Sequence, residues 1–314
     1  MCFSKFRKLI SAQNMEALSR ITAILLLVIA FSVQLGTAAE PLSVYVVNYP
    51  LKYFAERIGG EHARVEFPVP GDVDPAYWNP DLAVIAEYQQ ADLILLNGAG
   101  YAGWVAKVSL PRSKLVHTSK KFKGQYISIK GAVTHSHGGA GQHAHEDLAF
   151  TTWLDLTLAA RQAEAVALAL GRKRPALYDA FQRSYNVLAG ELKALDQEIQ
   201  AIVSQKPAMP LIVSHPVYDY FARRYGLNIQ NLHWEPDQVP DGEQWRMLET
   251  ILSRHPARWM IWEGRPVQAS VDGLKTRGVD SLVFDPCGTA PDQGDFMTVM
   301  KQNVENLRIA YQTQ

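Results

Sequence analysis

Cysteine is nearly missing from this sequence: among 314 residues only Cys2 and Cys287 carry a thiol. Cys2 lies in a stretch typical of a cleavable signal, so Cys287 would be the one cysteine of the mature chain. A single cysteine excludes an intramolecular disulfide. A hydrophobic core must therefore stabilise the fold, and a chain of this length can bury one or two.

A long uninterrupted hydrophobic segment is also lacking. The apolar run Ile21–Val33 is short for a membrane span, and polar residues follow it. Four basic residues precede the run, and Thr37-Ala38-Ala39 supplies the small residues of a cleavage site. Residues 1–39 are therefore predicted to be a secretory signal peptide, with a retained N-terminal anchor as the alternative. No cysteine directly follows the cleavage site, so a lipid anchor is not expected.

The chain has no excess of charge of either sign, with 31 basic and 31 acidic residues. Cleavage after Ala39 would remove four basic residues and one acidic residue, which leaves a slightly acidic mature protein. This balance gives no indication of a nucleic-acid partner or an anionic membrane surface. The HExxH and GxSxG motifs and a phosphate-binding glycine loop are absent as well, which argues against a hydrolase.

What the sequence does contain is a regular alternation of strand and helix patterns. Amphipathic helical stretches such as 80–90 and 242–255 separate short apolar runs. This alternation predicts an α/β fold with parallel sheets covered by helices. Eight strands are expected, four in each half: Leu42–Asn48, Ala63–Val69, Asp92–Asn97, Lys114–His117, Leu211–His215, Ile229–Trp234, Arg258–Trp262 and Ser281–Phe284.

The two halves resemble each other. Residues 53–59 and 220–226 both read Tyr-Phe-Ala-x-Arg-x-Gly, and each segment follows a strand and a proline. Duplication of a lobe explains the matching positions better than chance. The predicted division is a signal peptide at 1–39, an N-terminal lobe at 40–157 with a His-rich loop at 134–147, connecting helices at 158–205, and a C-terminal lobe at 206–314.

A long helix is expected between the two lobes. Pro175 suits a first helical turn, and apolar residues then recur every three or four positions to about Ser204. Roughly 30 helical residues would extend about 45 Å, which is more than a crossover within one sheet requires. The helix would therefore join the lobes as a rigid rod, although a coiled-coil dimer also fits a single apolar stripe.

Four histidines lie within the short segment between Thr134 and Asp147. They are His135, His137, His143 and His145. Imidazole binds zinc, copper and nickel, and the glycines among these histidines favour an exposed loop. Because pairs at i and i+2 occur twice, metal binding is preferred to an ordinary polar loop.

Further candidate ligands follow the predicted strands of the C-terminal half. Open parallel sheets bind ligands beyond the carboxyl ends of their strands. Those ends carry His215, Glu235, Glu263 and Asp285, whereas the N-terminal half offers Asn48, Asp74 and Asn97. Two lobes that face each other across a cleft would bring the two sets together.

Several motifs together resemble a known family. They are Val69-Pro70-Gly71-Asp72-Val73-Asp74-Pro75, Ala91-Asp92-Leu93, Asn97-Gly98-Ala99-Gly100, Trp153-Leu154-Asp155, Ser214-His215 and Asp285-Pro286. The mature chain is similar to the periplasmic solute-binding proteins that deliver zinc or manganese to ABC importers. This resemblance implies two α/β lobes joined by one long rigid helix, and a metal bound between them. It also implies that His215 and Asp285 are ligands, with His215 favouring zinc over manganese.

The sequence departs from that family at two positions. Ala76 and Thr151 stand where the resemblance would place histidine ligands. Three explanations are open: loop histidines replace the missing pair, which is preferred; Asp74, Glu235 or Glu263 completes a more oxygen-rich site; or the lobes bind something else. Taken alone, Glu235 and Glu263 are more typical of loop anchors, and Cys287 is more typical of a buried, inert thiol.

The expected function is metal transport. A monomeric periplasmic carrier would capture a divalent metal, zinc, and deliver it to an ABC permease in the inner membrane, without chemistry on a substrate. The metal ligands would be His215 and Asp285 together with His135, His137, His143 and His145. The alternatives are a periplasmic zinc chaperone or buffer, and a zinc-dependent hydrolase with Glu235 or Glu263 as base.

Overall fold

The computed structural model describes residues 40–71, 73–129 and 148–312. The predicted signal peptide and the four clustered histidines lie outside the described residues. The described residues from Pro41 onward belong to one compact unit, which holds both sheets and the long helix. Within the described part of the chain, no helix combines the length and the apolar character needed to span a membrane.

The first sheet is parallel, and its strands lie in the order β2-β1-β3-β4. The strands alternate along the chain with helix α2 (Tyr49–Gly59) and helix α3 (Leu82–Gln90). Asn48 and Asp81 cap these two helices by accepting hydrogen bonds from backbone N–H groups of their first turns. The strands are β1 (Leu42–Val46), β2 (Ala63–Glu66), β3 (Leu93–Leu96) and β4 (Leu115–His117).

The second sheet repeats this arrangement in the order β6-β5-β7-β8, again with all strands parallel. Its strands are β5 (Pro210–Val213), β6 (Asn228–Asn231), β7 (Trp259–Trp262) and β8 (Asp280–Val283). Its helices are α6 (Asp219–Tyr225), α7 (Gly242–Leu252) and α8 (Gln268–Lys275). Identical strand order in both halves is what a duplicated lobe predicts.

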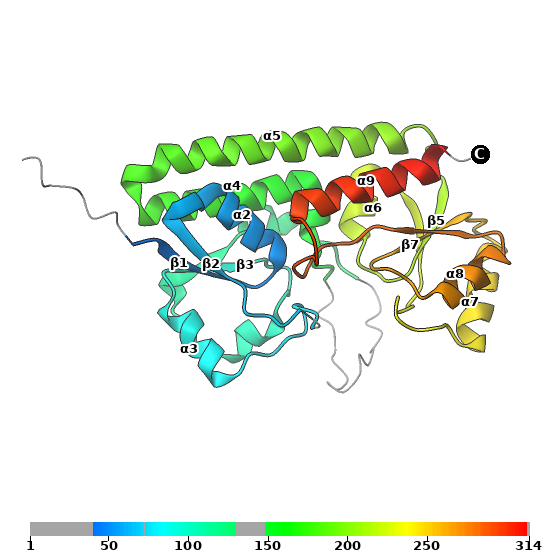
Figure 1. Cartoon of the computed structure of the whole chain (residues 1–314), viewed down its shortest axis with the longest axis horizontal. Helices are drawn as coiled ribbons and strands as arrows, with labels where there is room; N and C mark the ends of the chain where they lie inside the picture. Colours follow the sequence, from blue (N-terminus) through cyan, green and yellow to red (C-terminus); the bar gives the residue numbers. More distant parts are fainter. Residues whose placement is uncertain (1–39, 72, 130–147, 313–314) are drawn as a thin grey trace, which may run out of the picture. The chain divides into compact units, whose positions relative to one another are not determined.

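Three longer helices accompany the sheets: α4 (Leu156–Lys173), α5 (Tyr178–Val203) and α9 (Phe296–Gln312). Helix α5 has 26 residues, about 39 Å of helix. It contacts α2, α4, α6 and α9, and Figure 1 shows it running beside α4 and α9. Its buried apolar stripe consists of Phe181, Leu188, Leu192, Leu195, Ile199 and Ile202. The predicted α/β fold with two four-stranded parallel sheets and one long connecting helix is confirmed.

The observed boundaries differ slightly from the predicted ones. Each of the eight predicted strands is present, but several are shorter at the carboxyl end because the next residues turn toward a helix or loop. Pro175 begins a short 3-10 turn, Pro175–Leu177, rather than α5 itself. Further 3-10 turns are Gly60–His62, Gly103–Lys107, Arg112–Lys114, Lys120–Gln125 and Thr152–Leu154.

Candidate metal site

The carboxyl edge of the second sheet brings together the side chains that follow its strands. His215 comes two residues after β5, and Glu263 comes directly after β7. The backbone N–H of Trp234 donates to the carbonyl of Ser214 at 2.8 Å, so the segment after β6 stays beside the end of β5 and carries Glu235 toward His215. Parallel pairing thus places residues that are distant in sequence at one edge.

The imidazole of His215 is buried, and two carboxylates lie beside it. Its Nδ1 is 3.1 Å from Oε1 of Glu263 and 3.8 Å from Oε1 of Glu235. Burial lowers the pKa of His215 because the imidazolium loses hydration. The hydrogen bond and charge of Glu263, together with the charges of Glu235 and Asp74, outweigh burial and raise that pKa above 6.5. The surroundings of His215 therefore favour a positive charge.

His215, Glu235 and Glu263 have the composition and spacing of a metal site. Each offers one ligand atom, and the three atoms lie within 4.8 Å of one another. Over the described ranges, this is the group of three His, Cys, Asp or Glu side chains close enough to hold one ion. An imidazole nitrogen with two carboxylate oxygens suits zinc and also harder divalent metals.

Asp285 lies in the wall of the same cavity but outside the three-residue cluster. Its Oδ1 accepts a hydrogen bond from the backbone N–H of Cys287 at 2.6 Å, and Asn303 binds both the N–H and the carbonyl of Asp285. Burial raises the pKa of Asp285, the Cys287 N–H lowers it, and the charge of Glu263 raises it, with a net increase. The predicted pair His215 and Asp285 thus share one cavity, and Glu263 influences the pKa of both.

The cavity has a volume of about 530 Å3 and draws its walls from both halves of the chain. Asp74 belongs to the N-terminal wall, and its Oδ1 accepts a hydrogen bond from the backbone N–H of Ala76 at 2.8 Å. Beside Asp74, burial raises the pKa of the Tyr77 phenol, and the charge of Asp74 adds to the effect. The aromatic residues of this wall are Tyr77, Tyr101, Phe150 and Trp153.

Ala76 and Thr151 occupy the two positions where the resemblance implies histidine ligands. Ala76 is 8% exposed and has no side-chain donor. The Thr151 hydroxyl donates a hydrogen bond to the carbonyl of Val217, across the boundary between the two halves. Thr151 therefore joins the cavity walls to each other, and neither position supplies a nitrogen ligand.

Two further sequence predictions concern the four loop histidines and Cys287. His135, His137, His143 and His145 lie outside the described residues, so their participation in the site stays a prediction. Cys287 is 1% exposed, and burial raises the pKa of its thiol, with Asp285 adding to the effect. The thiol is therefore protonated, as expected for an inert buried cysteine.

Sequence reasoning underweighted three residues near His215. By sequence, Glu235 and Glu263 are more typical of loop anchors, because each precedes a proline or glycine, yet both carboxylates lie beside the imidazole. His233 carries no motif that marks it in the sequence, and its ring centroid is 5.9 Å from that of His215. The informative signal was their common position after neighbouring parallel strands.

Comparison with known proteins agrees with this architecture. The model of the family described as zinc-uptake complex component A, periplasmic (ZnuA), matches residues 44–310. The high-affinity zinc uptake system protein ZnuA of Bacillus subtilis (strain 168) is 24% identical over 293 residues, which cover 86% of this chain and 87% of that protein. The zinc-binding protein AdcA of Streptococcus pyogenes serotype M6 is 22% identical over 308 residues, which cover 90% of this chain and 60% of AdcA.

The same fold is found among solved structures. The crystal structure of the metal-dependent lipoprotein YcdH from Bacillus subtilis aligns with a TM-score of 0.73 at 21% identity, over 86% of this chain and 98% of YcdH. The family model matches residues 44–310, a range that contains both sheets and the long helix. The chain belongs to the ZnuA family of periplasmic zinc-uptake components.

Proposed function

We propose that this chain is the periplasmic solute-binding component of a metal ABC importer, which captures zinc in the cavity and delivers it to an inner-membrane permease. The observation that supports this most strongly is the cluster of His215, Glu235 and Glu263, with ligand atoms within 4.8 Å of one another. The relatives ZnuA and AdcA, named for zinc uptake and zinc binding, support zinc as the cargo.

The proposed ligand set is more oxygen-rich than the one expected from the resemblance. His215 supplies the nitrogen, Glu235 and Glu263 supply oxygens, and Asp285 in the cavity wall completes a set of four. Asp74, on the opposite wall, adds negative charge. This set follows the second of the three explanations for Ala76 and Thr151. The loop histidines then act as a capture antenna for metal ions.

The proposed action requires binding and release without catalysis. Carboxylates on both walls attract a cation and replace part of its hydration shell. Coordination also requires a neutral imidazole, so zinc must displace the proton that the carboxylates favour on His215. Protonation therefore opposes loading and assists release.

The remaining parts of the proposal concern the whole chain. A signal peptide at 1–39 would direct the protein to the periplasm, where it would act as a monomer. The N-terminal lobe at 40–157 and the C-terminal lobe at 206–314 would supply the two cavity walls, and the helices at 158–205 would connect them. The ABC permease is the proposed partner, and the divalent metal is the cargo.

A titration of zinc into the mature protein against a competing chelator tests the proposal. One tight, saturable zinc site is expected both in the wild type and in a variant that lacks residues 134–145. The deletion should remove only additional weak sites. Loss of the tight site on deletion would show that loop histidines coordinate the metal directly. No saturable binding to the wild type at micromolar zinc would refute the proposed function.

A further inference from the structure

The segment from His215 to the end of α6 is attached to the opposite cavity wall by a series of hydrogen bonds. Thr151 donates to the carbonyl of Val217, and the Tyr220 hydroxyl donates to the carbonyl of Ala149 at 3.2 Å. The segment 149–153 contributes Phe150, Thr151 and Trp153 to the cavity. The two walls thus meet along one seam, formed by residues 149–153 and 215–220.

One arginine lies at the far end of this seam. Arg224, in the last turn of α6, binds Asp196 of α5 through two nitrogens: Nε to Oδ1 at 2.8 Å and Nη2 to Oδ2 at 2.5 Å. The Tyr225 hydroxyl donates to the same carboxylate at 3.0 Å. The Asp196 side chain is 8% exposed and that of Arg224 is 31% exposed, so the carboxylate of this bidentate pair is largely shielded from water while the guanidinium stays partly hydrated.

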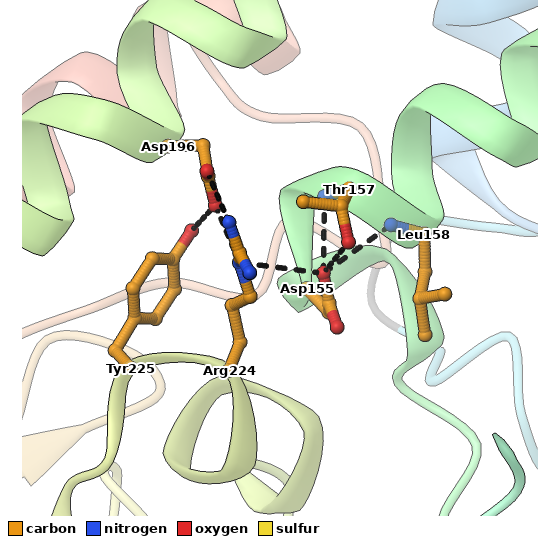
Figure 2. A network of polar contacts seen from close by, with 6 residues as sticks. All are labelled: Asp155, Thr157, Leu158, Asp196, Arg224 and Tyr225. Carbon is orange, nitrogen blue, oxygen red and sulfur yellow. Dashed lines mark hydrogen bonds and ion pairs between the residues drawn. The ribbon is translucent and has the colours of Figure 1, made fainter.

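The same guanidinium also faces the N-terminus of α4. Arg224 Nε is 4.0 Å from Oδ1 of Asp155, and this carboxylate caps α4 by accepting hydrogen bonds from the Thr157 and Leu158 backbone N–H groups. Figure 2 shows the guanidinium between the two aspartates. Asp155 immediately follows the turn that carries Trp153. Arg224 therefore connects the element after His215 to the element after Trp153 and to the long helix.

We infer that Arg224 is a positioning residue for the cavity: by joining α6 to Asp196 and Asp155, it fixes the His215 wall against the Trp153 wall. It lines no part of the cavity and acts through the seam. Its effect on cargo rests on the proposed zinc-binding function, whereas its effect on the seam does not. A guanidinium suits this position because its planar fork can bind one carboxylate in a bidentate manner while it faces a second.

Arg224→Met tests the inference by keeping the apolar stem and removing the charge. Arg57→Met is the matched control, because Arg57 also pairs with a glutamate of α5, Glu191, at 2.8 and 3.0 Å, and also binds a tyrosine hydroxyl. Asp155→Asn is a second probe, since asparagine still caps a helix but loses the charge near Arg224.

The first measurement is amide hydrogen exchange in the metal-free protein. Arg224→Met is expected to accelerate exchange in 149–153 and 215–220 by about 2- to 30-fold, and Arg57→Met is expected to leave these segments unchanged. Equal exchange in wild type and Arg224→Met, or equal acceleration in both variants, would overturn the inference whether or not zinc binds.

The second measurement is zinc dissociation after mixing with excess chelator. Faster release by about 2- to 30-fold is expected for Arg224→Met, a smaller increase for Asp155→Asn, and wild-type release for Arg57→Met. Arg224→Lys should release zinc at a rate between those of the wild type and Arg224→Met, because lysine keeps the positive charge but lacks the bidentate fork. Wild-type release from Arg224→Met would overturn the link to cargo, whereas absence of zinc binding in the wild type would refute the proposed function instead.

Discussion

The two halves of the molecule share one strand order, but they use the carboxyl edges of their sheets differently. The second residue after the central strand is Asn48 in the first half and His215 in the second. The residue directly after the neighbouring strand is Asn97 in the first half and Glu263 in the second. The same sheet topology thus carries neutral amides at the carboxyl edge of the first sheet and ionisable groups at the carboxyl edge of the second.

The neutral edge is a satisfied network. Oδ1 of Asn97 accepts hydrogen bonds from Nε2 of Gln162 at 3.0 Å and from Nδ2 of Asn48 at 3.4 Å, and Gln162 also donates to Thr118. All four side chains are at most 1% exposed. Such a network rigidifies a buried edge, because each polar group has a partner of matching donor or acceptor type.

The ionisable edge instead places several charged groups close together. His215 is the imidazole beside Glu235 and Glu263, and Asp285 lines the same cavity. Several carboxylates near one imidazole are costly to keep together without a cation. Because the backbone topology is the same in both halves, the difference between the two edges comes from the residue types at the strand ends.

His215→Asn makes the C-terminal edge resemble the N-terminal one, and it should have the largest effect. We expect zinc affinity to fall by about 100-fold or more, because the nitrogen ligand is lost and asparagine coordinates zinc poorly. A chelator-competition titration measures the change. His62→Asn is the control, since His62 is a partly exposed histidine of the N-terminal half. Wild-type affinity in His215→Asn would contradict the assignment.

Glu263→Gln should have the next largest effect on binding. We expect zinc affinity to fall about 10- to 100-fold through loss of an anionic ligand. The pKa of His215 should also fall, because Glu263 is the main group that opposes burial there. Titration of the His215 ring protons by NMR checks this shift. An unchanged or higher pKa would exclude Glu263 as the controlling carboxylate.

Gln162→Leu disrupts the neutral edge and separates stability from binding. Removing the donor to Asn97 and Thr118 should lower the free energy of unfolding by about 1–3 kcal/mol. The zinc affinity of the folded protein should stay within about twofold, because no ligand is changed. Urea denaturation and zinc titration measure the two quantities. Gln89→Leu, at an exposed glutamine, is the control and should change stability little.

The pH dependence should be the smallest of these effects near neutrality. Zinc affinity should fall as the pH drops through the raised pKa of His215, above 6.5, by about tenfold per unit below it. The metal-free protein should behave oppositely: protonated His215 stabilises it below the unfolded-state pKa, and this contribution disappears as the pH rises through the folded-state pKa. A flat binding profile between pH 5.5 and 8 would contradict the role of His215.

The sequence predicted the fold more completely than the site. Buried parallel strands appear as short apolar runs, and apolar residues recur every three or four positions along the helices, so all eight strands and the long helix could be located. Strand ends were less certain. Asn48, for example, ends the predicted strand Leu42–Asn48, but its side chain caps α2.

The candidate site is formed by residues that are far apart in the sequence and lie close together only in the folded chain. The resemblance implies His215 and Asp285 as ligands, whereas Glu235 and Glu263 have motifs equally typical of loop anchors. Their closeness to His215 follows from the order β6-β5-β7, which places β5 between the other two strands. The sequence suggested each residue, but only the pairing of the strands shows which carboxylates lie beside the imidazole.

Anomalous diffraction at the zinc edge, from crystals of the mature protein grown with zinc, locates the bound metal. One strong peak is expected within coordination distance of His215, Glu235 and Glu263. A peak elsewhere in the protein, with none beside His215, would contradict the proposed metal site.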